Sequence, residues 1–447
     1  MPNRCPGGRG RRGLARTSVI AVMLVGLAGL GLTAGPRQGT SVLEEYRRAA
    51  QAAGKKDYRL AVEHFSRALA GAPTHPGLMA ELARAQALAG DREAALARLA
   101  AALTLGSGLD VVDDPAMATA LTGDAAAGVR EAAALLRAPV TSSDEAFRLA
   151  QRDLIPEGIA YDPSGRSFFV GSIYRRKIVR IDPGGRVSDF VAEARDGLMA
   201  VLGMKVDSAR GALWVATEGT VNMRGGTAAD VGRAALRQYD LRSGRLVKEL
   251  ELRPDPGPHL FNDVVVDRQG QVFVTDSEDG SVWRLRHGSG RLERLAGPRA
   301  LDYPNGLALS SDERRLFVAH LAGISVFNVA TGHASALPHP GSMTLTDIDG
   351  LYREGHRLVA VQNGLTPARI AVFDMTPDED RVVAMRVLER GHPLFASIPT
   401  TGAVADGWFY YIANAQLRAF GPNNDILPME KLQQPVILRT RLASEGR

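Results

Sequence analysis

Hydrophobic and polar residues are patterned in two different ways along this chain, and the change falls near residue 140. Over residues 41–140, alanine-rich stretches place apolar residues three and four positions apart, the spacing of one face of an α-helix. From residue 145 onward, short apolar runs alternate with turns rich in Gly, Asp and Pro, which is typical of an all-β domain. The pattern predicts a helical section, 41–140, a linker at Pro139–Asp144, and a β domain, 145–447.

The helical section repeats with a period of 34 residues. The recurring positions are Ala61, Phe65 and Ala68, followed by Ala95, Leu99 and Ala102. Small residues let paired helices approach closely, and this period resembles that of tetratricopeptide repeats. A third, degenerate unit is expected over Asp110–Leu136. Two interpretations stay open: a surface that docks a protein partner, or a spacer that packs on the β domain.

The β domain contains six strand-turn-strand units. Their second strands are Ser167–Gly171, Ala212–Ala216, Gln271–Thr275, Arg315–Ala319, Arg357–Val361 and Trp408–Ile412. The first strands start at Glu157-Gly158, Leu202-Gly203, Asn262-Asp263, Asn305-Gly306, Asp349-Gly350 and Thr401-Gly402. A repeat of about 40 to 60 residues has room for the four strands of a propeller blade. We therefore predict a mainly β fold, a six-bladed β-propeller, with Gly219–Gly232 as a rim loop and Glu145–Gln151 beside Pro435–Leu442 closing the last blade.

The N-terminus carries most of the basic charge. Six arginines precede the first acidic residue, Glu44, so the rest of the chain is close to neutral and nothing indicates nucleic-acid binding. Five of them precede the apolar stretch Ser18–Gly35, a pattern that fits a signal peptide or an uncleaved membrane anchor over residues 1–38. Either one predicts export to the periplasm or another extracytoplasmic space, with membrane contact only through this segment.

Several common enzyme classes are excluded by their missing motifs. The single cysteine, Cys5, lies ahead of the apolar stretch, so the folded part has no disulfide. The chain has no P-loop, no H-E-x-x-H pair and no G-x-S-x-G elbow, which excludes the usual nucleotide, zinc-protease and serine-hydrolase sites.

Four of the six first strands start with an oxygen-bearing side chain: Glu157, Asn262, Asn305 and Asp349. The first strands of a propeller line its central channel, so these residues can converge although they are far apart in sequence. Each alone is also an ordinary turn residue. Together, two carboxylates and two amide oxygens suit a hard divalent cation, most readily Ca²⁺.

Other polar residues near these starts have structural interpretations. Asp263 and Asp267 are expected to cap turns within the third blade. His259 and His320 lie near the expected mouth of the channel, where a packing role is favoured over contact with a ligand.

The chain resembles the SMP-30/gluconolactonase-like family of six-bladed propellers over about residues 147–420. The resemblance rests on four short motifs in order: IPEGIAYDP (Ile155–Pro163), FNDVVVD (Phe261–Asp267), YPNGLALSSD (Tyr303–Asp312) and IDGLY (Ile348–Tyr352). It implies that Glu157, Asn305 and Asp349 hold a catalytic divalent metal and that Asn262 contacts water or substrate beside it. It also implies that Asp349 accepts a proton. The sequence departs from the family at Leu260, where its lactonases often have Arg, and at Val264, where they have Gly.

Two functions follow from these observations. The first is a metal-dependent hydrolase of a lactone or ester, in which Asp349 acts as general base and a small molecule is the substrate. The second is a non-catalytic ligand- or protein-binding propeller with a structural metal, in which the helical repeats are a docking arm. Loss of an Arg at position 260 removes a donor fork for a sugar-like polyol and weakens the case for an aldonolactone substrate.

Overall fold

The computed structural model describes residues 41–442. The predicted signal peptide or anchor, 1–38, lies outside the described residues. Within the described range, the structure has no helix that combines the length and apolar character needed to cross a bilayer.

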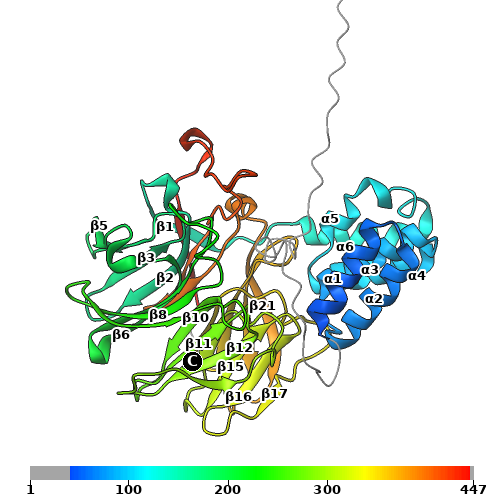
Figure 1. Cartoon of the computed structure of the whole chain (residues 1–447). Helices are drawn as coiled ribbons and strands as arrows, with labels where there is room; N and C mark the ends of the chain where they lie inside the picture. Colours follow the sequence, from blue (N-terminus) through cyan, green and yellow to red (C-terminus); the bar gives the residue numbers. More distant parts are fainter. Residues whose placement is uncertain (1–40, 443–447) are drawn as a thin grey trace, which may run out of the picture. The chain divides into compact units, whose positions relative to one another are not determined.

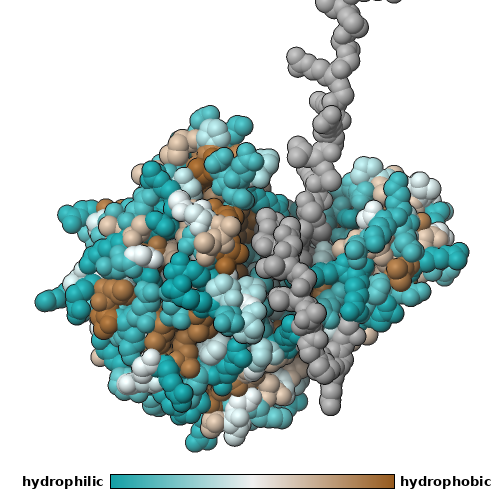
Figure 2. Space-filling view, in the orientation of Figure 1, coloured by the Kyte–Doolittle hydropathy of each residue, from teal (hydrophilic) through white to brown (hydrophobic). Residues whose placement is uncertain are grey.

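The helical section begins with two helix hairpins. These are α1 (Val42–Gly54) with α2 (Tyr58–Gly71), and α3 (Pro76–Ala89) with α4 (Arg92–Leu105). The side chain of each N-cap residue accepts a hydrogen bond from a backbone amide of the first turn; the four N-cap residues are Ser41, Asp57, His75 and Asp91. The alanines and large residues of the 34-residue period are buried where the helices meet. Most of the helical surface visible in Figure 2 is hydrophilic.

The third helical unit, predicted to be degenerate, is less regular than the first two. Residues 110–136 form a four-residue helix, α5 (Leu109–Val112), two short 3-10 turns and one longer helix, α6 (Ala127–Arg137). Pro115 and Gly123 interrupt the region where a full first helix would lie. A complete helix pair over Asp110–Leu136 is therefore not formed.

The rest of the described chain forms six four-stranded antiparallel sheets, which are the six predicted blades (Figure 1). The innermost strands are β2 (Pro156–Asp162), β6 (Ala200–Asp207), β10 (Phe261–Val266), β14 (Leu307–Leu309), β18 (Leu351–Glu354) and β22 (Gly402–Ala405). The second strands are β3 (Ser167–Ser172), β7 (Ala212–Glu218), β11 (Val272–Asp276), β15 (Arg315–His320), β19 (Arg357–Gln362) and β23 (Trp408–Ile412).

The two outer positions of each blade complete the sheets. The third strands are β4 (Lys177–Ile181), β8 (Ala234–Asp240), β12 (Ser281–Leu285), β16 (Gly323–Asn328), β20 (Arg369–Met375) and β24 (Val436–Arg441). The outermost strands are β5 (Val187–Val191), β9 (Leu246–Leu252), β13 (Glu293–Ala296), β17 (Ala334–Ala336), β21 (Val382–Arg390) and β1 (Ser143–Arg148).

The propeller closes by combining strands from both ends of the domain. β1 pairs with β24, so the last blade has the order β1-β24-β23-β22. Figure 1 shows β1 beside the red C-terminal strand. The predicted closure is thus confirmed. Contacts between successive innermost strands run around the ring, and β22 contacts β2.

The hydrophobic core is divided among the blade interfaces. One buried cluster fills each of the six interfaces between neighbouring blades, built from alternate residues of the facing strands. A further cluster, which includes Ile155, Met199, Leu202 and Met223, lies where the innermost strands of the first two blades begin. The Gly219–Gly232 segment connects β7 to β8 as the predicted loop.

Candidate functional site

The four predicted site residues occupy equivalent places in four blades. Glu157 and Asn262 are the second residues of β2 and β10, while Asn305 and Asp349 each lie two residues before the next innermost strand. All four are buried, with 5–6% of their surface exposed. The innermost strands surround the axis of the propeller and carry these residues on their backbones. Residues far apart in the sequence can therefore lie close to one another at the axis.

The glycines that follow three innermost starts serve close packing around the axis. A Cβ on Gly158 would lie 1.9 Å from the Leu202 carbonyl oxygen, and one on Gly203 would lie 2.6 Å from that of Asn262. A Cβ on Gly306 would lie 2.4 Å from the Asp349 carbonyl oxygen. None of these glycines has a positive φ, so none is needed for a left-handed backbone conformation. Neighbouring innermost strands need glycine because their backbones nearly touch.

Asn305, Asp349 and Asn363 form one hydrogen-bonded group. Asn305 Nδ2 donates to Asp349 Oδ1 over 2.9 Å, and Asn363 Nδ2 donates to Asp349 Oδ2. Asn363 also donates to the Pro399 carbonyl oxygen over 3.0 Å. The Asp349 carboxylate is therefore held in one orientation by two amides.

Asn262 connects to the same group through Ser277. Asn262 Nδ2 donates to Ser277 Oγ over 3.0 Å, and Ser277 Oγ donates to the Pro304 carbonyl oxygen over 2.6 Å. Pro304 directly precedes Asn305, whose own carbonyl oxygen accepts a bond from Thr275 Oγ1. The third and fourth blades thus fix the relative positions of Asn262 and Asn305.

Two oxygens of the site are buried without a hydrogen-bond partner among residues 41–442. They are Glu157 Oε2 and Asn305 Oδ1. A buried oxygen acceptor left unpaired is costly, and a carboxylate oxygen more so. Both atoms are of the kind that a hard cation binds, because Ca²⁺ takes carboxylate and amide oxygens as ligands.

The acidic groups of the channel repel one another. Burial raises the pKa of Glu157 well above its usual range, and the nearby carboxylates of Asp349 and Asp263 raise it further. Burial raises the pKa of Asp349 to about 6, against the opposing effect of the bonds from Asn305 and Asn363. A bound divalent cation would reverse this repulsion, because it favours the ionised form of each carboxylate.

Asp263 belongs to this channel and does not cap a turn. It is 6% exposed, its Oδ1 accepts from its neighbour Val264 N over 2.8 Å, and burial raises its pKa to about 7. Lys205 lies close enough to lower that pKa. The turn assignment for Asp263 is wrong because the residue lies within β10, at the irregularity between Phe261 and Val264 where the register with β11 shifts. The assignment for Asp267 is right: its Oδ1 accepts from Gln271 N over 2.7 Å.

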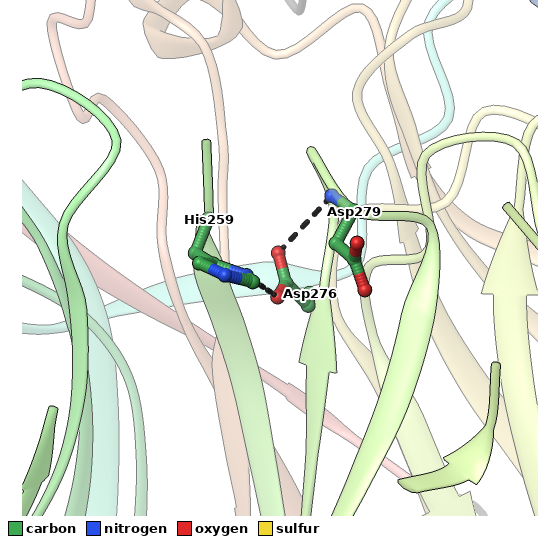
Figure 3. Close-up of side chains that lie close together, drawn as sticks. All are labelled: His259, Asp276 and Asp279. Atoms are coloured by element: carbon green, nitrogen blue, oxygen red, sulfur yellow. Dashed lines mark hydrogen bonds and ion pairs between the residues drawn. The ribbon is translucent and has the colours of Figure 1, made fainter. Parts of the chain in front are cut away.

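A second cluster of possible metal ligands, His259, Asp276 and Asp279, lies in the third blade (Figure 3). Asp276 is fully buried and accepts from His259 Nδ1 at 2.6 Å, Trp283 Nε1 at 3.1 Å and two backbone amides. Asp279 pairs with Arg294 at 3.0 Å. The carboxylates of this cluster are already paired, so its geometry is that of a structural hydrogen-bond network. The packing role predicted for His259 agrees with these contacts.

The other histidine at the predicted mouth also has a local partner. His320 Nε2 lies 2.9 Å from Ser325 Oγ, and burial lowers the pKa of His320 to about 4. It is neutral at physiological pH, so it adds no positive charge to the channel.

Sequence reasoning missed several residues that shape the site. Asn363 follows a second strand and reads as an ordinary turn residue in Gln362-Asn363-Gly364. Glu218 ends β7, and burial together with Glu278 raises its pKa to about 8. The signal available for both was position: each lies at the end of a second strand, the same edge of the blade as the starts of the innermost strands.

Comparison with known families supports the fold and the resemblance. Residues 155–343 match the sequence model of the SMP-30/gluconolactonase/LRE-like region. The matched stretch includes Glu157, Asn262 and Asn305, and Asp349 follows six residues after its end. The β domain is thus similar to the SMP-30/gluconolactonase/LRE-like region over these residues.

Solved structures with similarity to this chain include three enzymes. A gluconolactonase from Xanthomonas campestris is 18% identical, with 68% of this chain and 97% of that chain covered and a TM-score of 0.44. A luciferin-regenerating enzyme is 13% identical, with 68% and 95% covered and a TM-score of 0.46. A virginiamycin B lyase from Staphylococcus aureus is 13% identical, with 67% and 98% covered and a TM-score of 0.43. At these sequence identities and TM-scores, the similarities support no conclusion about the function of this chain. No curated protein matches the chain.

Proposed function

We propose that this chain is a divalent-metal-dependent hydrolase that opens a lactone or cleaves an ester at the propeller axis. Two buried oxygens carry the proposal, Glu157 Oε2 and Asn305 Oδ1, which have no hydrogen-bond partner among residues 41–442 and accompany the oriented carboxylate of Asp349. The match to the SMP-30/gluconolactonase/LRE-like region supports the same reaction class.

Glu157, Asn305 and Asp349 would hold the metal, with Asn262 beside it. When bound, a cation of the Ca²⁺ type would act as a Lewis acid and offset negative charge that develops on the substrate carbonyl. The two carboxylates supply the charge that binds it, and the two amides add neutral donors.

Asp349 is the residue placed to move the proton. It accepts a proton from water as the water oxygen bonds to the acyl carbon, and the proton then goes to the alkoxide oxygen released when the acyl C–O bond breaks. Bonds from Asn305 and Asn363 keep its carboxylate in one orientation throughout. Asn262 Nδ2 donates one of its two hydrogens to Ser277 Oγ, and its other hydrogen can be donated to the water or the substrate.

The wall beside Asn262 favours a substrate with an apolar substituent. Leu260 packs against the cluster that contains Met199, Leu202 and Met223. An apolar side chain there offers no donors to the hydroxyls of a sugar lactone. We therefore expect alkyl lactones or aryl esters to be better substrates than aldonolactones.

The test is hydrolysis by the purified full chain of a panel of alkyl lactones, aldonolactones and aryl esters, with Ca²⁺ and with a chelator. We expect turnover that the chelator removes, that added Ca²⁺ restores and that Asp349→Asn reduces by about 10²-fold or more. Asp240→Asn, at an exposed turn bonded to Ser243, is the matched control and should retain full activity. Turnover that survives both the chelator and Asp349→Asn would contradict the mechanism.

A non-catalytic binding propeller is the second candidate. Leu260 and the attached helical section favour it, because neither is needed for hydrolysis of a small lactone. In that case Ca²⁺ would raise the unfolding temperature of the chain while every substrate stayed intact.

A further inference from the structure

The helical section contacts the propeller at loops that carry the site residues. The N-terminus of α1 meets Asp302: Ser41 Oγ donates to Asp302 Oδ1, and Val42 N donates to Asp302 Oδ2 over 2.9 Å. Asp302 lies three residues before Asn305 in the same short loop. Ser41 and Val42 are buried, so this contact belongs to a packed interface.

The N-terminus of α3 meets the loop that carries Asp349. His75 Nδ1 lies 3.4 Å from Asp347 Oδ2, and both residues are buried, with 0% and 6% exposed. Asp347 has a φ of 60°, a conformation that costs a non-glycine residue free energy unless its surroundings hold it. Thr346 Oγ1 also donates to Asp347 Oδ2, over 2.7 Å. Asp349 follows two residues later.

The end of α4 meets the loop that follows Asn363. Thr366 N donates to Ser107 Oγ over 2.9 Å, and Arg369 Nη1 donates to the Leu105 carbonyl oxygen over 3.4 Å. Arg369 is 2% exposed and also donates to Gln362, the residue before Asn363. The amide that orients Asp349 therefore lies on a segment fixed from the helical side.

These three contacts share one property that chance packing would not require. Each reaches a propeller loop within three residues of Asn305, Asp349 or Asn363, which are the three members of the hydrogen-bonded group. A chain segment of three residues spans at most about 11 Å, so anchoring one end limits the movement of the other.

We propose that the helical section is a built-in support of the propeller site, and that Ser41, His75 and Ser107 are positioning residues for Asn305, Asp349 and Asn363. The support keeps the carboxylate and the two amides at a fixed spacing before any ligand arrives, which lowers the cost of assembling the site on binding. The effect of this support on catalysis rests on the hydrolase function proposed above, whereas its effect on the mobility of the loops is independent of that function.

Hydrogen–deuterium exchange of the full chain without added metal tests the support directly. The test variants, Ser41→Ala, Ser107→Ala and the triple variant with His75→Ala, change only helical-side residues and leave the propeller sequence intact. Exchange of the amides in 303–306, 347–351 and 361–366 should rise about tenfold in the triple variant, while the peptide 200–217 of the second blade stays unchanged. The two single serine variants should each raise exchange only in the loop they contact.

Two controls separate positioning from general loosening. Arg92→Gln removes bonds within the helical section, from Arg92 to the carbonyl oxygens of Ala120 and Thr122. Thr104→Val removes a bond within α4 alone. Neither should change exchange in the three loops. Unchanged loop exchange in Ser41→Ala, Ser107→Ala and the triple variant would overturn the proposal.

A Ca²⁺ titration of the same proteins connects the support to the site. We expect the triple variant to bind Ca²⁺ about tenfold more weakly than the parent, with Arg92→Gln unchanged. Equal affinity of parent and triple variant would overturn the positioning role. If the parent itself binds no Ca²⁺, the proposed hydrolase function fails, and the exchange result still decides whether the helical section holds the loops.

Discussion

Asn305 Nδ2 donates a hydrogen bond to Asp349 Oδ1 over 2.9 Å, and the other side-chain atom of Asn305, Oδ1, is buried where no donor among the described residues reaches it. One amide thereby does two things. It orients the carboxylate proposed as the base, and it presents a neutral oxygen beside that carboxylate. Glu157 Oε2 provides the second buried acceptor, so the site is rich in oxygen ligands and short of donors.

Replacing Glu157 with Gln should weaken metal binding and stabilise the metal-free protein. Loss of a direct ligand should lower Ca²⁺ affinity by at least about 100-fold, because even the loss of a residue that supports a ligand costs up to that much. Without Ca²⁺, the unfolding temperature should rise, since a buried carboxylate that repels Asp349 and Asp263 is gone. Calcium titration and thermal unfolding in chelator measure the two effects.

Glu145→Gln is the matched control for this substitution. Glu145 pairs with Arg148 on the outer strand β1, and both side chains are about half exposed, at 44% and 49%. Such pairs contribute about 0–1 kcal/mol, so neither Ca²⁺ affinity nor stability should change appreciably. A metal-free Glu157→Gln protein that is less stable than the parent would contradict the repulsion described for the channel.

The stability of the metal-free chain should fall as pH rises. The pKa values of Asp349 and Asp263 are raised in the folded state to about 6 and about 7, so their protonation favours folding. Their contribution is complete below the pKa of about 4 that an aspartate has in the unfolded chain, and it is lost as pH rises through about 6 to 7. A difference of one unit between the pKa of a group in the folded and in the unfolded state corresponds to about 1.4 kcal/mol of unfolding free energy. Unfolding in chelator between pH 4.5 and 8 measures this loss.

The affinity of the chain for Ca²⁺ should have the opposite pH dependence to the stability of the metal-free chain. The cation needs ionised carboxylates, so its affinity should rise with pH through the same range. Asp349→Asn should flatten both profiles. Metal-free stability that increases steadily from pH 5 to 8 would be inconsistent with the raised pKa values.

Asp276→Asn should damage the fold and leave the metal site intact. Asp276 is fully buried and accepts from His259, Trp283 and two backbone amides. In the variant, the NH2 group of Asn would face some of these donors, which should lower the free energy of unfolding by about 2–4 kcal/mol. The Ca²⁺ stoichiometry and affinity should match those of the parent. Loss of the bound ion in this variant alone, with Glu157→Gln still binding, would move the metal site to His259, Asp276 and Asp279.

Gly203→Ala should disturb Asn262 by steric contact. Its Cβ would lie 2.5–2.6 Å from Asp263 Oδ1, the Asn262 carbonyl oxygen and the Asp263 Cα. Two backbones must separate to admit it, which costs about 1–3 kcal/mol or more and shifts the start of β10. Gly341→Ala is the control, because its Cβ meets nothing within 4 Å. Chemical unfolding and catalytic rate, measured on both variants, should change only for Gly203→Ala.

The sequence predicts the propeller well because every blade repeats the same physical requirement. Each blade needs an alternating strand on either side of a turn, and six copies of that pattern are visible without knowledge of any contact. The equivalent places of Glu157, Asn262, Asn305 and Asp349 in their blades follow from the same logic, since one position in a repeat occupies one place in the ring. The predictions fail where a residue departs from its repeat.

Asp263 and Asn363 illustrate that failure. Asp263 stands where the other five blades have a close-packing glycine, and its neighbours across the channel come from other blades. Asn363 reaches Asp349 from the end of a second strand, a place the repeat does not mark as part of the site. Contacts such as that of His75 with Asp347 join segments more than 250 residues apart, and no local sequence pattern predicts them.

The most direct test of the proposed metal site is a crystal structure of the full chain grown with Ca²⁺. We predict one ion at the propeller axis, about 2.3–2.6 Å from Glu157 Oε2, Asn305 Oδ1 and a carboxylate oxygen of Asp349. Crystals at millimolar Ca²⁺ with no ion at the axis, or with the ion held by His259, Asp276 and Asp279, would contradict it.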